Sequence, residues 1–186
     1  GSMSDELEYL KAEIGYIAET IKESQGNITM RFSLIVYRDV GDAYVTRVFD
    51  FTEDLSDFQV DLNNQSAGGG GDYPEAMHTA MQNMNSLSWD GGNVARVAFL
   101  IADAPPHTKN ADKFLEEVGI ARELGVKVYP VAASGVADEA EYLMRVAAQA
   151  TLARYLFLTD DSGIGNSHAE PKIPCYHVQL LNQLTL

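Results

Sequence analysis

The sequence lacks the features that define several large classes of protein. Its 186 residues include a single cysteine, Cys175, and only 13 lysines and arginines against 27 aspartates and glutamates. One cysteine excludes an internal disulfide framework or a zinc site built from several thiolates, so Cys175 is expected to be inert. A net charge of −14 argues against nucleic-acid binding and docking on anionic lipid, because both need a basic face. No apolar run approaches the roughly 18 residues that a membrane-spanning helix needs, so we expect no membrane insertion.

The cellular compartment is not fixed by this composition. Secreted proteins of this size can lack disulfides, and we favour an extracellular or periplasmic location over a cytoplasmic one. The first three residues, Gly1, Ser2 and Met3, are either native or a cloning remnant, and both interpretations stay open.

The composition that remains is that of a folded domain. Hydrophobic residues make up 46% of the chain and charged residues 22%, which suffices for a buried core. At about 150 residues per domain, residues 1–186 are expected to form one domain.

Apolar spacing predicts alternating strands and helices. Helical spacing of three and four residues covers 4–24, 54–65, 74–88, 110–124 and 137–151, and strand patterns cover 29–37, 43–51, 95–102, 126–133 and 154–159. Pro74 is expected in a first helical turn and Pro130 to cause a strand irregularity. Residues 160–174 are expected to be loop and 175–186 a short helix or extended end. This pattern predicts an α/β fold: a doubly wound, mostly parallel, Rossmann-like open sheet with one antiparallel edge strand, 43–51, and helices on both faces.

Acidic residues follow the predicted strands, at the edge where open α/β sheets bind ligands. This acidic edge comprises Asp39, Asp72, Glu75, Asp103, Asp160, Asp161 and Glu170, with His168 nearby. Carboxylates without thiols or paired histidines suit a hard divalent cation such as Mg²⁺, Mn²⁺ or Ca²⁺. The alternative is that these aspartates only cap helices and close turns. Other acidic residues, including Glu6, are expected to be ordinary helix surface.

Other sequence motifs carry little chemistry. The run Gly68–Gly71 lacks the Gly-Lys-Ser/Thr ending of a phosphate-binding loop, and no Gly-x-Ser-x-Gly nucleophile elbow is present. His107, after two prolines, is expected to face solvent. His168 is expected to make hydrogen bonds within its polar loop.

Three segments together resemble the von Willebrand factor type A domain. Residues 1–7 (GSMSDEL) resemble the end of its Asp-x-Ser/Thr-Gly-Ser motif running into the first helix. Residues 69–76 (GGGDYPEA) resemble the Gly-rich loop of many bacterial members, and 100–105 (LIADAP) resemble the strand that ends in aspartate. The resemblance covers nearly the whole chain.

The resemblance implies a metal-ion-dependent adhesion site. Ser2 would bind the cation through its hydroxyl and Asp103 would bind it directly or through water. Asp72 stands beside Gly71, the position of the family's loop threonine, and is the third expected ligand. The open coordination position would accept an acidic side chain of a protein partner. The three motifs do not cover Asp39, Asp160, Asp161 and His168, which are expected on the same edge as outer ligands or as ligands of an additional ion.

The resemblance also identifies two departures. The family's leading aspartate and the central strand that carries it do not appear in these 186 residues. We therefore expect either that these residues are a fragment or that the strand is supplied by another chain or segment. The loop threonine is also replaced. Both departures would lower cation affinity.

Three functions follow as hypotheses. The first is a module that binds a protein partner through a divalent cation. The second is a metal-assisted hydrolase that uses the same carboxylates with His107 or His168 as base. The third is a structural assembly domain with a degenerate ion site.

Overall fold

The computed structural model describes residues 3–26, 28–68, 74–133, 135–159 and 175–177. Its elements in chain order are α1 (Ser4–Gln25), β1 (Phe32–Tyr37), β2 (Thr46–Thr52), α2 (Leu55–Asn63), α3 (Met77–Asn85), β3 (Arg96–Ala102), a 3-10 turn (Thr108–Asn110), α4 (Ala111–Glu123), β4 (Val126–Ala132), α5 (Asp138–Ala150) and β5 (Leu156–Phe157). The predicted alternation of helices and strands is confirmed.

The described strands form two sheets. β1 and β2 pair antiparallel, and β3, β4 and β5 form a parallel sheet in that order. The α/β class and the antiparallel edge strand are therefore confirmed. Pro130 causes no irregularity, because the β3–β4 register passes unbroken through the Leu100–Pro130 pair.

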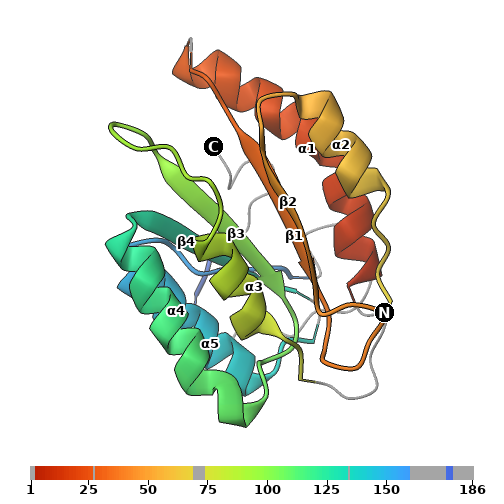
Figure 1. Ribbon diagram of the computed structural model, residues 1–186, viewed down its shortest axis with the longest axis vertical. Helices are drawn as coiled ribbons and strands as arrows, with labels where there is room; N and C mark the ends of the chain where they lie inside the picture. The colour runs from red at the N-terminus through yellow and green to blue at the C-terminus, as the bar shows by residue number, and fades with distance from the viewer. Residues whose placement is uncertain (1–2, 27, 69–73, 134, 160–174, 178–186) are drawn as a thin grey trace.

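The helices form layers on the sheets. Figure 1 shows α3, α4 and α5 together beside the parallel sheet, and α1 and α2 beside the β1–β2 pair. The main core lies between α3, α4, α5 and the parallel sheet, and its fully buried side chains include Met77, Phe114, Val128 and Met144. Burial of such side chains is the main contribution to stability, at about 1.5–3 kcal/mol for each large apolar residue.

The prediction that Glu6 is a surface residue is wrong, because only 5% of Glu6 is exposed. It precedes the buried Ile17 by eleven residues, which is close to three helical turns. The two side chains therefore share the inward face of α1.

Residues Glu75 and Ala76 join the carboxyl ends of β1 and β3. The Ala76 N–H donates to the Arg38 carbonyl oxygen at 3.2 Å, and the Glu75 N–H donates to the Pro105 carbonyl oxygen at 2.9 Å. Glu75 also forms a parallel bridge with Pro106. This extended pairing delays α3 to Met77, so the prediction that Pro74 lies in a first helical turn is wrong.

Candidate functional site

The ends of β1 and β3 and the start of α3 bring six polar side chains to one edge of the fold. We call this group the rim, and it consists of Tyr37, Asp39, Glu75, His78, Asp103 and His107. The connections through Glu75 and Ala76 hold its three segments together.

His107 binds Asp39 across the rim. Its Nε2 lies 2.9 Å from both carboxylate oxygens of Asp39. Asp39 is 5% exposed, and 26% of the His107 side chain is exposed. The expectation of a solvent-facing His107 is therefore wrong. The loop after β3 turns its imidazole toward the loop after β1, where a buried carboxylate needs hydrogen-bond donors.

The pKa of Tyr37 reflects its burial and the negative charges of the rim. Burial raises the pKa of its phenol well above the usual value of 10, and the nearby carboxylates of Asp103 and Glu75 raise this pKa further. Both effects disfavour a negative charge on the phenolate. Tyr37 is therefore a neutral hydroxyl beside two acidic side chains at physiological pH.

Asp103 lies directly after β3 and is 8% exposed. Its carbonyl oxygen accepts a hydrogen bond from the Ala137 N–H at 3.2 Å, which ties the loop after β3 to the start of α5. The backbone at Asp103 is thus held on both sides, by the sheet and by the helix. Of the expected ligands, Asp103 is the one within the described residues.

His78 is a rim residue that the sequence analysis did not select. Burial lowers its pKa below 6.5, and electrostatic interactions with Lys113 and His107 lower it further. Asp39 and Glu117 act in the opposite direction with smaller effect. The signal available in the sequence was its place in the first turn of the helix that follows the Gly-rich run 68–71.

The remaining predicted site residues stay predictions. Ser2, Gly71, Asp72, Asp160, Asp161 and His168 lie outside the described residues. The expected ligand set of Ser2, Asp72 and Asp103 is therefore described only at Asp103.

The rim offers oxygen donors but does not by itself fit a divalent cation. The carboxylates of Asp39, Glu75 and Asp103 are oxygen donors of the kind that Mg²⁺ and Ca²⁺ prefer. Within the described part of the chain, however, no group of three or more His, Cys, Asp or Glu side chains is arranged to hold a metal ion. Both Asp39 oxygens already bind His107. The described residues alone do not form a cation site.

The comparisons with solved structures agree on the fold. BatB of Bacteroides thetaiotaomicron matches with a TM-score of 0.60 and 17% identity, covering 82% of this chain and 79% of that one. An aerotolerance-related membrane protein of Bacteroides fragilis matches with a TM-score of 0.60 and 16% identity, covering 84% and 83%. None of the described helices of the present chain has the length and apolar character needed to cross a membrane.

Two curated relatives share part of the sequence. An ariadne-like RING finger protein of Acanthamoeba polyphaga mimivirus is 30% identical over 120 residues, and the alpha-protein kinase vwkA of Dictyostelium discoideum is 33% identical over 109 residues. The matches cover 63% and 58% of this chain, but only 12% and 17% of those much longer proteins. The model of the von Willebrand factor A domain family matches residues 1–165. The chain therefore belongs to the von Willebrand factor A domain family.

Proposed function

We propose that this domain binds a protein partner at the rim and that a divalent cation mediates the contact. Domains of this family are generally interaction modules. The observation that carries the proposal is the buried Asp103 at the carboxyl end of β3, where the backbone of Glu75 and Ala76 joins the ends of β1 and β3. Ligands of open α/β sheets bind at this edge.

In this proposal Ser2, Asp72 and Asp103 hold the cation, which is Mg²⁺, Mn²⁺ or Ca²⁺. Gly71 lets the backbone pass close to the site. The side chains of Asp39, Asp160, Asp161 and His168 surround it. A bound cation supplies a coordination position for an acidic side chain of the partner, which the negative rim would otherwise repel.

We also propose that a further strand, ending in the family's leading aspartate, lies between β1 and β3. Two features support it. Among the described residues, β1 and β3 belong to different sheets and do not pair with each other. Their carboxyl ends are nevertheless joined by the backbone hydrogen bonds of Glu75 and Ala76. A strand there would pair with both neighbours and add a carboxylate to the proposed cation site.

The test is a calorimetric titration with Mg²⁺, Mn²⁺ and Ca²⁺. It uses the 186-residue chain and the same chain extended by an apolar strand ending in Asp-x-Ser before Gly1. We expect the extended chain to bind a cation more tightly than the shorter chain. Asp103→Asn should abolish binding, because it removes a charged oxygen donor with little change in shape.

The matched control is Asp112→Asn, which neutralises an exposed aspartate on α4. It should leave cation affinity unchanged. Thermal unfolding of each variant checks that the fold is retained. An extended chain that binds no cation, or binds it equally well with Asp103→Asn, would show that the proposed cation site is wrong.

A further inference from the structure

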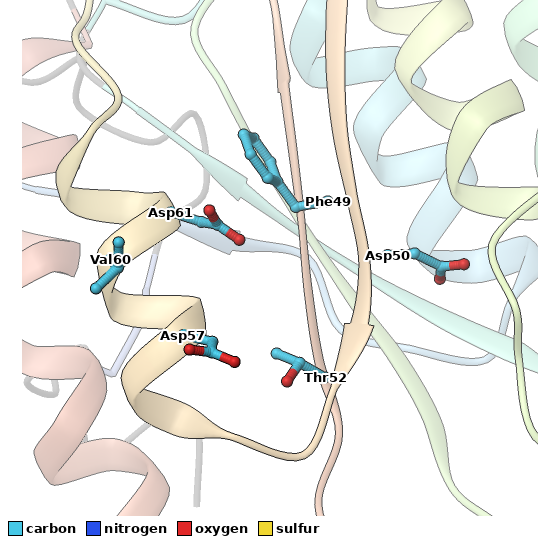
Figure 2. A pocket seen from close by; sticks show the side chains of 6 residues that line it. All are labelled: Phe49, Asp50, Thr52, Asp57, Val60 and Asp61. Atoms are coloured by element: carbon cyan, nitrogen blue, oxygen red, sulfur yellow. The ribbon is translucent and has the colours of Figure 1, made fainter.

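A hollow lies between β2 and α2, away from the rim. It is lined by Phe49, Asp50, Thr52, Asp57, Val60 and Asp61 and has a volume of about 300 Å³. Figure 2 shows Asp57 and Asp61 on α2 facing the hollow, with Phe49 and Thr52 opposite them on β2, while Asp50 points to the other side of the strand. The hollow therefore has two carboxylates on one wall and an aromatic ring on the other.

The outer edge of β2 borders this hollow and has no strand partner among the described residues. β2 pairs only with β1 in that part of the chain. The Arg38 N–H donates to the Val45 carbonyl oxygen at 2.9 Å, and the antiparallel register continues from this pair to Leu34 and Phe49. Because hydrogen-bonded pairs alternate along such a ladder, the backbone N–H and C=O of Val48 point outward. An extended segment could pair with them.

The charged residues that line the hollow are all acidic, namely Asp50, Asp57 and Asp61. Arg47 on β2 is not among the lining residues, and its guanidinium donates to the Gln65 side chain beyond the end of α2. Helix α2 and its N-cap carry Asp54, Asp57 and Asp61. Asp54 has a structural role, since its carboxylate accepts hydrogen bonds from the Ser56 and Asp57 N–H groups. The side chains of Asp57 and Asp61 have no such role in the contacts of the described residues.

The positions of Asp57 and Asp61 lower the stability of α2. They are four residues apart, where like charges repel by a few tenths of a kcal/mol. Asp61 also lies in the last turn of α2, where the helix dipole disfavours a negative charge. A cation between the two carboxylates would relieve both effects. Val60 is 58% exposed beside them and offers apolar surface.

We propose that the β2 edge binds an extended segment of another protein, with a lysine or arginine of that segment seated in the hollow. The segment adds as a strand to β2 through the outward backbone groups of Val48. The cationic group lies between Asp57 and Asp61, and its aliphatic stem packs on Phe49 and Val60. This site needs no metal ion and is separate from the rim.

The test uses a labelled nine-residue peptide of alternating threonine and valine with one central lysine. Matched peptides carry norleucine or glutamate at that position. Fluorescence anisotropy is measured in EDTA, so that failure of the cation proposal has no influence on this result. We expect the lysine peptide to bind at least roughly tenfold more tightly than the norleucine peptide, with the glutamate peptide weakest. Added salt should weaken the binding of the lysine peptide.

The double variant Asp57→Asn, Asp61→Asn should remove the preference for lysine, and Asp112→Asn should retain it. Hydrogen exchange should show that the lysine peptide protects residues 46–52. In a second variant, Val48→Pro removes the outward N–H and should weaken all three peptides together. Equal binding of the three peptides, an unchanged lysine preference in the double variant, or no protection of β2 would overturn the proposal.

Discussion

The imidazole of His107 and the carboxylate of Asp39 connect two strands that do not pair with each other. His107 follows β3 and Asp39 follows β1, and Nε2 lies 2.9 Å from each carboxylate oxygen. Together with the backbone bonds of Glu75 and Ala76, this contact holds the two described sheets together at their carboxyl ends. The rim therefore has a structural role whether or not it binds a ligand.

The first prediction concerns the contribution of this contact to stability. Asp39→Asn and His107→Gln should each lower the free energy of unfolding, and the double variant should lose less than the sum. We expect a coupling energy of about 1–3 kcal/mol, since Asp39 is buried and the bond involves a charged group. Urea unfolding of the four proteins at constant pH measures it.

His177→Gln is the control for this cycle, because His177 is exposed. It should change stability by less than about 0.5 kcal/mol. A coupling energy indistinguishable from zero would mean that Asp39 and His107 stabilise the fold independently.

The elements of the core were predictable because their patterns are local. In α5 the buried residues Ala140, Leu143, Met144 and Ala147 recur at helical spacing, and this stripe alone defines the helix. The strands β3 and β4 were equally clear as short apolar runs between helices. The burial of Glu6 was also predictable, because Glu6 precedes the apolar Ile17 by eleven residues, about three helical turns, and therefore lies on the same face of the helix.

The rim was less predictable because it depends on contacts between distant segments. Asp39 and His107 are 68 residues apart, and neither loop carries a signal that names the other. At Pro74, a favourable local signal for a helix start lost to the tertiary pairing of Glu75 with Pro105 and Pro106. The strand ends predicted that Asp39 and Asp103 follow β1 and β3 at one edge of the fold, but not which pairs of side chains form there.

A second prediction concerns Thr151, which is 4% exposed beside β4. Its Oγ1 accepts a hydrogen bond from the Val128 N–H at 3.0 Å and donates one to the Ala147 carbonyl oxygen at 2.8 Å. Thr151→Val keeps the shape but leaves the Val128 N–H without this acceptor. We expect a loss of about 1–3 kcal/mol in the free energy of unfolding.

Thr151→Ser provides the matched comparison, since it retains the hydroxyl and removes a methyl group. It should be more stable than Thr151→Val in urea unfolding. If valine were tolerated as well as serine, the hydroxyl would make no net contribution and methyl packing would explain the choice of threonine.

The third prediction concerns the dependence of stability on pH through His78. Burial, aided by Lys113 and His107, lowers the pKa of His78 in the folded chain below the unfolded value of about 6.5. The unfolded chain therefore binds a proton that the folded chain resists. The stabilisation associated with neutral His78 is fully present above pH 6.5 and is lost as the pH falls below it.

His78→Gln should remove this part of the acid sensitivity. Urea unfolding between pH 5 and 8 is expected to give a smaller decline in stability for His78→Gln than for the unmodified chain. His177→Gln should show the same decline as the unmodified chain, because that histidine is exposed. An equal decline in all three proteins would assign the acid sensitivity to other groups, with the pair of Asp39 and His107 as the next candidates to examine by the same substitutions.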